Sequence, residues 1–251
     1  MVVEPTADAE QELAAQFFER FPSVRRAVVI GLDEVGRGAL AGPVMVGAFA
    51  LGFTRAAGAG TDSAPTVTAG DGARPAPVAL PIPDELPAGI RDSKLLTPKR
   101  RSAVCTALQA DDALVWAVGR ASALETDEVG ISQALGQAAA RALAAVGERL
   151  AAEQPNTAIA GVILDGNLDV VTGALSGIQV LTRAKADRDC LSVAAASVLA
   201  KVERDDLMTA ISEHASVYGW ASNKGYGSAA HRAAIAEHGL HPEHRASWKL
   251  T

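Results

Sequence analysis

The chain has 251 residues, of which 49% are hydrophobic, and its 29 acidic residues outnumber its 23 basic ones to give a formal net charge of -6 at pH 7. This length can bury one full core with an appended region, and the acidity argues against a protein that coats DNA nonspecifically. No apolar run approaches the roughly 18 residues of a membrane span, and the first twenty residues lack the basic start of a secretion signal. With only two distant cysteines, Cys105 and Cys190, we expect a cytoplasmic protein without disulfides and without a membrane partner.

The N-terminal part predicts a helix followed by a strand. Phe17, Phe18 and Phe21 recur near helical spacing, so residues 1–25 are interpreted as a helical extension. The short β-branched run Ala27–Ile30 predicts a buried strand. Two carboxylates follow shortly after this run, at the predicted end of the strand.

The sequence Asp-Glu-Val-Gly-Arg-Gly at this point is typical of an active site. Asp33 and Glu34 would emerge on opposite faces of the strand, and they repel each other unless a hard divalent cation, Mg²⁺ or Mn²⁺, lies between them. The backbone N–H groups around Arg37 can approach a phosphate or sugar closely, because Gly36 and Gly38 lack side chains. The alternative interpretation is an ordinary turn with exposed acids.

The glycines at this point do not form a dinucleotide-binding fingerprint. Their spacing is GxGxxxG, and Pro43 follows the last of them. The next segment, Val44–Leu51, predicts a second buried strand rather than a helix whose N-terminus would hold a pyrophosphate. We therefore do not favour a dinucleotide site.

A low-complexity segment separates the first two strands from the rest of the chain. Thr54–Pro77 is rich in Ala, Gly, Pro, Ser and Thr and cannot bury enough apolar surface to offset its ordering entropy. We interpret it as a disordered insertion or long flexible loop, with a functional linker as the alternative. Order is expected to resume at Val78–Ile82, and Thr97 with Pro98 marks the start of a helix.

Two further strands flank a long predicted helix. Leu114–Arg120 predicts a strand, and the alanine-rich pattern from Asp127 to Ala152 predicts a helix with Gly136 and Gly147 as weak points. Ala158–Leu164 then predicts another buried strand.

This second half of the chain also delivers acids at the ends of its elements. Asp165 follows the buried strand, and after a short predicted strand at Ile178–Leu181 comes Asp187. The next segment, Cys190–Lys201, predicts a helix that Asp187 or Asp189 could cap. Strand ends in an α/β sheet are where such sites are built, so we expect these acids to meet those of the first strand. A turn residue and a helix cap are the respective alternatives.

Basic residues and histidines offer less specific signals. The basic residues gather in two stretches, namely Arg91, Lys94, Lys99, Arg100 and Arg101, then Arg183, Lys185, Arg188, Lys201 and Arg204. Either stretch could face phosphates, although solvated helix ends are the simpler interpretation of each one taken alone. The C-terminal histidines have no cysteine partners and no regular ligand spacing, so a surface or substrate-groove position is preferred to a zinc site for His231, His238, His241 and His244.

Six blocks in order form a pattern far more specific than any one of them. They are Asp33 to Gly38, Asp92-Ser93-Lys94, Leu164-Asp165-Gly166, Lys185-Ala186-Asp187, Ala194 to Ser197 with Ala200-Lys201-Val202, and Asn223 to Gly227. Together they resemble bacterial ribonuclease HII, a type 2 ribonuclease H, over about Val28 to the C-terminus. The resemblance implies an α/β ribonuclease H-like fold with a five-stranded mixed sheet flanked by helices. It also implies a catalytic domain at 26–209 and a small helical C-terminal substrate-binding region at 210–251.

The implied activity is endonucleolytic hydrolysis of RNA in RNA–DNA hybrids, including single ribonucleotides embedded in duplex DNA. The cut would fall 5′ of the ribonucleotide and leave a 3′-hydroxyl and a 5′-phosphate, which starts the excision of misincorporated ribonucleotides. The resemblance further implies two Mg²⁺ or Mn²⁺ ions and a catalytic, metal-ligating quartet of Asp33, Glu34, Asp165 and Asp187. Asp189 lies close enough in sequence to compete with Asp187 for its place. A monomer is the default expectation.

The resemblance also implies the substrate contacts. The loop Gly36–Gly38 would read the ribonucleotide, since its backbone can bond the 2′-hydroxyl that distinguishes RNA from DNA. Tyr226 would pack on the sugar of the following deoxynucleotide. Phosphate contacts are implied for Ser93, Lys94 and Lys201.

The sequence departs from the family pattern at two places, and two other functions share some of its features. The low-complexity segment and Ala186, where glycine is common in the family, remove no catalytic group. A related metal nuclease such as a junction resolvase would share the acids without needing the glycine loop and Tyr226. A nucleic-acid-binding protein that has lost activity would lack at least one of the four carboxylates, and all four are present.

Overall fold

The computed structural model of the chain describes residues 4–55, 86–166, 171 and 177–250. The expected strand at Val78–Ile82 lies outside the described residues, as does the expected insertion apart from Thr54 and Arg55. Among the helices of the described part, none is long and apolar enough to cross a membrane.

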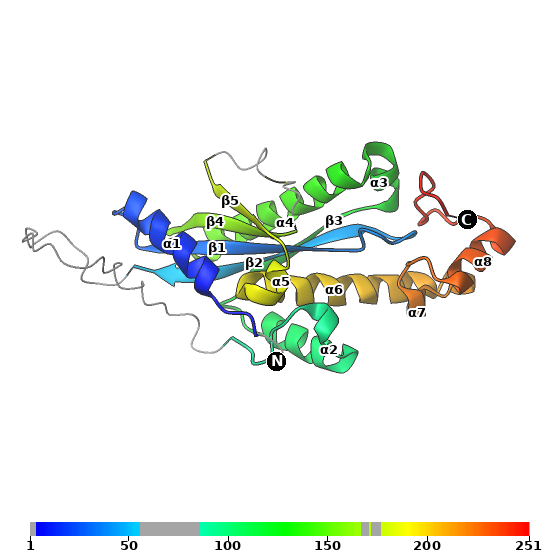
Figure 1. Ribbon diagram of the computed structural model, residues 1–251, viewed down its shortest axis with the longest axis horizontal. Coiled ribbons are helices and arrows are strands. Elements are labelled where there is room, and N and C mark those ends of the chain that lie inside the picture. Colours follow the sequence, from blue (N-terminus) through cyan, green and yellow to red (C-terminus); the bar gives the residue numbers. More distant parts are fainter. Residues whose placement is uncertain (1–3, 56–85, 167–170, 172–176, 251) are drawn as a thin grey trace, which may run out of the picture.

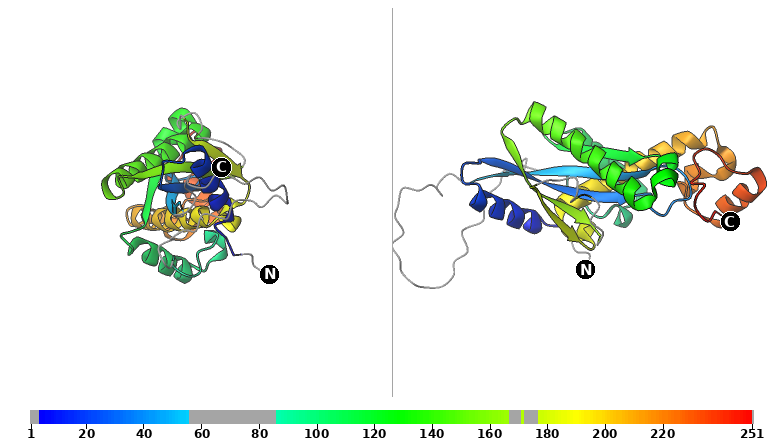
Figure 2. Two further views of the ribbon diagram at one scale, coloured as in Figure 1. Left: turned by 90° about the vertical axis from the view of Figure 1, so that its left-hand side faces the viewer. Right: turned by 90° about the horizontal axis from the view of Figure 1, so that it is seen from above.

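The centre of the molecule is a five-stranded mixed sheet with the strand order β3-β2-β1-β4-β5 (Figures 1 and 2). Its strands are β1 (Arg26–Val35), β2 (Val44–Thr54), β3 (Val115–Ala121), β4 (Thr157–Asp165) and β5 (Gln179–Arg183). β1 runs antiparallel to β2 and parallel to β4, β3 is antiparallel to β2, and β5 is parallel to β4. The predicted mixed five-stranded sheet is confirmed.

Helices cover both faces of the sheet. They are α1 (Asp8–Arg20), α2 (Pro98–Gln109), α3 (Ala123–Val129), α4 (Ile131–Glu153), α5 (Ala186–Asp189), α6 (Leu191–Ser212), α7 (Trp220–Asn223) and α8 (Ala229–His238). The long helix α4 packs its alanines and leucines on one face, while α6, α2 and α1 share a core with the other face (Figure 1). The short helix α7 lies alongside the last turns of α6, and α8 extends the molecule beyond the far end of α6 (Figure 1).

Alternation along β1 decides which of its side chains face α6. Val29 belongs to the core on the α6 side and Ile30 to the core on the α4 side. Gly31 continues the α6 row, where a Cβ would overlap Ser192, so the absence of a side chain lets α6 pack directly on the strand. Asp33, two residues further, therefore faces α6 as well.

The long helix predicted from Asp127 to Ala152 is in fact two helices, α3 and α4. The chain breaks at Gly130, which ends α3 and begins α4 with φ +78°, a conformation that costs glycine little because it has no Cβ. The predicted weak points Gly136 and Gly147 lie inside the unbroken α4.

The predicted helix Cys190–Lys201 is the first part of α6, which continues well beyond it. The expectation that Asp187 or Asp189 caps this helix is wrong. The cap comes from α1, where the Glu10 carboxylate accepts hydrogen bonds from the N–H and the hydroxyl of Ser192 at 2.8 and 2.7 Å. A side chain from a distant segment therefore satisfies the start of α6.

The C-terminal region, predicted as 210–251, follows α6 without a break, and the predicted boundary falls inside that helix. α7, α8 and the last residues pack around the buried Trp220. His231 and His244 are buried beside it, so the expected surface or groove position is wrong for these two. Their rings pair with each other at 3.1 Å, and the indole N–H of Trp220 donates to His231 at 2.9 Å.

Candidate active site

Three acidic side chains from distant parts of the sequence converge beside α6. Asp33 lies in β1, and Asp165 is the last residue of the adjacent parallel strand β4. Asp187 lies in α5, and the N–H of Ala186 before it donates to Oδ1 of Asp165 at 2.7 Å. Asp33 and Asp187 are each only 4% exposed. The structure thus gathers three of the four predicted carboxylates.

Burial and mutual repulsion oppose ionisation of these carboxylates. Burial raises the pKa of Asp33 to about 7; a hydrogen bond from Ser197 opposes this rise, and the charges of Asp165 and Asp187 add to it. Burial likewise raises the pKa of Asp187 to about 6, with a further contribution from Asp165. A cation placed among the three would relieve the repulsion and favour their charged forms.

Glu34 occupies a different position from the other acids. It follows Asp33 along β1 and so points to the opposite face of the sheet. Its carboxylate is partly exposed and accepts a hydrogen bond from the Arg37 guanidinium at 3.3 Å. The backbone N–H of Glu34 donates to Oδ1 of Asp33 at 2.8 Å, so Glu34 meets the cluster through its main chain, whereas its carboxylate pairs with Arg37.

The segment before α2 supplies a cation that faces the acids. Burial disfavours the charged form of Lys94, but the charges of Asp33, Asp187, Asp92 and Asp165 outweigh this and raise the pKa of Lys94. Its backbone N–H is held by the Asp92 carboxylate at 2.9 Å, which starts a short 3-10 helix. One lysine therefore partly balances a cluster of carboxylates.

Two hydroxyls connect this segment to Asp33. The hydroxyl oxygens of Ser93 and Ser197 lie 2.9 Å apart, both side chains are buried, and Ser197 also hydrogen-bonds Asp33. The N–H of Ser93 is 3.4 Å from the Ser197 oxygen. Ser93 is thus placed behind the carboxylate, where it orients Asp33 through Ser197.

Asp92 is part of the predicted motif Asp92-Ser93-Lys94, but the sequence alone did not identify it as a functional residue. Asp92 is 1% exposed and accepts a hydrogen bond from the Arg188 guanidinium at 3.4 Å. Its charge also raises the pKa of Asp187, so it belongs to the electrostatics of the site. Its position directly before Ser93 and Lys94 was the available signal.

Lys201 and Asp189 lie apart from the cluster. The Lys201 ammonium pairs with Asp205 at 2.6 Å, one turn further along α6. The exposed Asp189 pairs with Arg183 at 2.9 Å. Of the two acids that competed for one place in the predicted quartet, Asp187 is the one directed at Asp165.

The predicted substrate loop is held against the C-terminal region. The backbone N–H groups of Leu40 and Ala41 both bond the carbonyl of Gly225, next to Tyr226. Gly36 has φ +83°, and Tyr226 is exposed, with 38% of its surface accessible. The structure therefore brings the glycine loop and Tyr226 together on one edge of the molecule.

Two buried arginines at this loop escaped sequence reasoning. The sequence allows Arg204 to face a phosphate and favours a solvated helix end, but Arg204 is fully buried and donates to the carbonyls of Ala41 and Pro43. Arg245, equally buried, donates to the carbonyl of Gly36. Nothing in the local sequence marks an arginine whose acceptors, among the described residues, are backbone carbonyl oxygens.

The donor chemistry of the cluster suits a hard divalent cation. Three carboxylates converge, burial and repulsion raise the pKa of two of them, and Mg²⁺ and Mn²⁺ prefer such oxygen ligands. No group of three or more acidic, histidine or cysteine side chains among the described residues is yet close enough to hold an ion. The residues thus fit a metal by chemistry rather than as a preformed cage.

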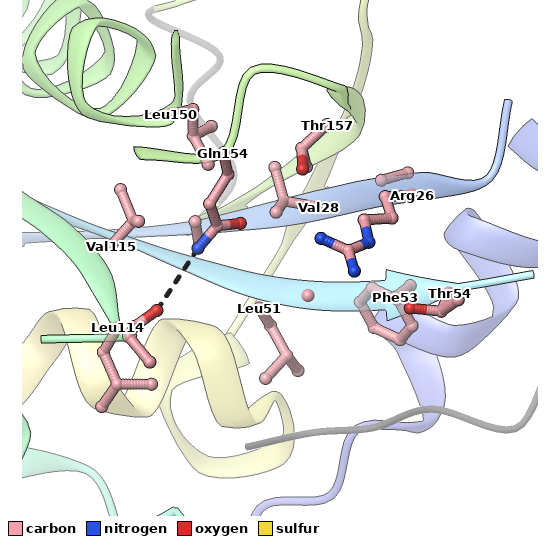
Figure 3. A pocket seen from close by; sticks show the side chains of 14 residues that line it. Arg26, Val28, Leu51, Phe53, Thr54, Leu114, Val115, Leu150, Gln154 and Thr157 are labelled. Atoms are coloured by element: carbon pink, nitrogen blue, oxygen red, sulfur yellow. Dashed lines mark hydrogen bonds between the residues drawn. The ribbon is translucent and has the colours of Figure 1, made fainter. Parts of the chain in front are cut away.

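A cavity of about 330 Å³ lies at the other end of the sheet (Figure 3). It is lined by the start of β1 at Arg26 and Val28 and the end of β2 at Phe53, and Gln154 reaches across it to the carbonyl of Ala113 at 3.4 Å. None of the described residues that line it carries a carboxylate. It is therefore separate from the acidic cluster, which lies toward the end of β1.

Comparison with known proteins gives consistent sequence relatives. The family model described as Ribonuclease HII matches residues 78–251. Ribonuclease HII of Streptomyces avermitilis is 39% identical over 245 residues, which cover 97% of this chain and 83% of that protein. Ribonuclease HII of Synechococcus sp. is 36% identical over 249 residues, which cover 98% and 89%.

Solved structures share the fold at lower identity. The PCNA:RNase HII complex from Archaeoglobus fulgidus matches with a TM-score of 0.58 at 24% identity, covering 89% of this chain and 96% of that one. Bst-RNase HIII in complex with Mn²⁺ matches with a TM-score of 0.61 at 20% identity, covering 92% and 70%. These structural matches support the fold alone.

Proposed function

Because this chain belongs to the ribonuclease HII family of RNA–DNA hybrid endoribonucleases, we propose that it cleaves at single ribonucleotides embedded in duplex DNA. The cut falls on the 5′ side of the ribonucleotide and leaves a 3′-hydroxyl and a 5′-phosphate. This reaction would start the excision of misincorporated ribonucleotides from cellular DNA, and we place it in the cytoplasm, carried out by a monomer. The convergence of Asp33, Asp165 and Asp187 carries the proposal.

The carboxylates would hold the metal ions. Asp33, Asp165 and Asp187 supply oxygens from three elements, and the Glu34 carboxylate would join them by leaving Arg37 and turning toward Asp33. Two bound Mg²⁺ or Mn²⁺ ions would lower the pKa of the attacking water and stabilise the leaving 3′-oxygen. Ser197 holds the Asp33 carboxylate in place.

The remaining proposed residues bind the substrate. Gly38 is open, since a Cβ there would meet nothing within 4 Å, so the space beside it is available to a ribose rather than filled by protein. The exposed ring of Tyr226 offers a flat surface for a sugar. Lys94 faces the acids and is placed to bind the scissile phosphate, while Lys201 would reach a phosphate only by leaving Asp205.

The decisive experiment uses a labelled DNA duplex with one ribonucleotide and a matching all-DNA duplex, each with Mg²⁺, Mn²⁺ or a chelator. We expect a metal-dependent cut 5′ of the ribonucleotide that Asp33→Asn abolishes. Asp111→Asn is the matched control, because this acid only holds the N–H of Ala113 in a turn away from the cluster. No cut with either metal would reject the proposed function.

A further inference from the structure

Two fully buried arginines hold the backbone of the glycine loop by its carbonyl oxygens. The Arg245 guanidinium donates to the carbonyl of Gly36 at 2.8 Å, to that of Arg37 at 3.0 Å and to that of Gly42 at 3.0 and 3.2 Å. Among the described residues no carboxylate lies within ion-pair distance of this guanidinium. Its positive charge is therefore stabilised by peptide oxygens.

These hydrogen bonds to the carbonyls also fix the direction of the N–H groups that belong to the same peptides. In a trans peptide the C=O and the following N–H point in opposite directions. With the carbonyls of Gly36 and Arg37 directed at Arg245, the N–H groups of Arg37 and Gly38 point away from the protein interior. Those two donors lie beside the open space at Gly38.

Arg204 joins this loop to the tyrosine segment. Its guanidinium donates to the carbonyls of Ala41 and Pro43 on one side and of Lys224 on the other, at 2.9 to 3.1 Å. It also lies 5.5 Å from the centre of the Tyr226 ring, and a Cβ at Gly36 would overlap it. One rigid, planar group thus contacts both predicted substrate-reading elements.

Retaining two charges in the interior is costly, and an apolar side chain would fill the same space at lower cost. Unlike an apolar group, the guanidinium supplies several hydrogen-bond donors in a fixed planar arrangement. We propose that Arg245 and Arg204 are positioning residues for ribose recognition. Arg245 aims the N–H groups of Arg37 and Gly38 at the 2′-hydroxyl, and Arg204 keeps Tyr226 in register with that loop. The inference rests on the proposed function.

The test measures binding in the inactive Asp33→Asn background. Its readout is the preference for a duplex with one ribonucleotide over the matching all-DNA duplex. Arg245→Lys keeps the charge but loses the fork, and we expect the preference to fall about tenfold. The matched control is Arg55→Lys, which removes an arginine that holds the carbonyls of Phe18 and Pro22 at the other end of the sheet, and it should keep the preference.

If Arg245 had only a structural role, Arg245→Lys would weaken binding of both duplexes equally or only lower the melting temperature. An unchanged preference of Arg245→Lys for the ribonucleotide duplex would therefore overturn the positioning role. A parent chain with no preference would instead reject the proposed substrate. The Gly38 amide gives a second readout by NMR in the parent chain, even if the arginine variants fail to fold. Its resonance should shift on adding the ribonucleotide duplex but not the all-DNA duplex, and equal shifts would overturn the inference.

Discussion

The buried histidine pair makes folding stability depend on pH in a way that can be calculated. The indole N–H of Trp220 donates to Nε2 of His231, whose Nδ1 lies 2.9 Å from the carbonyl of Tyr226. Nδ1 of His244 accepts the N–H of His241 at 2.9 Å, so its proton sits on Nε2, 3.1 Å from Nε2 of His231. Both rings are therefore neutral, and a second proton would place two donors face to face.

The size of the effect follows from the pKa of His244. Burial, helped by the neighbouring His231, lowers this pKa from 6.5 to about 4. Between these values the unfolded chain binds a proton that the folded chain does not, so stability is full above pH 6.5 and falls as the pH drops toward 4. From pH 7 to pH 5 the loss amounts to about 2 kcal/mol of unfolding free energy. The raised pKa values of Asp33 and Asp187 act in the opposite direction, so the comparison must be made against a variant.

We expect urea denaturation to show that, between pH 7 and pH 5, the unfolding free energy of the native chain falls by about 2 kcal/mol more than that of His244→Gln. Glutamine keeps a donor toward His231 but cannot titrate. His214→Gln, at an exposed position, is the control and should behave like the native chain. Equal losses in the native chain and His244→Gln would refute the reasoning.

Three further outcomes test the acidic cluster and the glycine loop. Without metal at pH 8, Asp33→Asn should raise the unfolding free energy by about 2 to 4 kcal/mol, because a carboxylate with a raised pKa destabilises the fold once it is ionised. A denaturation series with and without Mn²⁺ should show that this gain shrinks when metal is present, because the metal binds and stabilises only the native chain. Asp187→Asn should lower kcat by about a hundredfold or more. Asp189→Asn, which removes an exposed ion pair, should change kcat less than about threefold. Similar kcat values for the two variants would contradict the choice of Asp187 as the metal ligand. Gly36→Ala should destabilise the fold by about 1 to 3 kcal/mol, because Gly36 has a positive φ and a Cβ there would overlap an arginine. Gly38→Ala should leave the melting temperature unchanged and lower the cleavage rate about tenfold. Melting curves and cleavage kinetics of the two variants would establish or refute this contrast.

The strands were predictable because their signal is local. Ala27–Ile30 and Ala158–Leu164 are apolar and β-branched enough to indicate buried strands, and both lie within observed strands. Thr97 and Pro98 also start a helix as predicted, with the Thr97 hydroxyl accepting the N–H of Arg100 at 3.4 Å. Local patterns of this kind carry their own physical cause.

What the sequence could not show depends on contacts between distant segments. The cap of α6 comes from Glu10, 182 residues before Ser192, so no local pattern could reveal it. The break at Gly130 competed with an uninterrupted alanine-rich helical pattern. For the site, the family motifs named the acids, but the positions of Arg204 and Arg245 follow only from the fold, because a buried arginine and a solvated one look alike in sequence.

The order in which the parts are synthesised bears on when this nuclease can become selective. The guanidinium that holds the carbonyl of Gly36 belongs to a residue made 209 positions later. All three converging carboxylates, the last of them Asp187, leave the ribosome well before it. A growing chain can thus assemble its acidic cluster while the loop that would recognise ribose still lacks its clamp. If Arg245 has the proposed role, sugar discrimination would follow the assembly of the acidic cluster during synthesis.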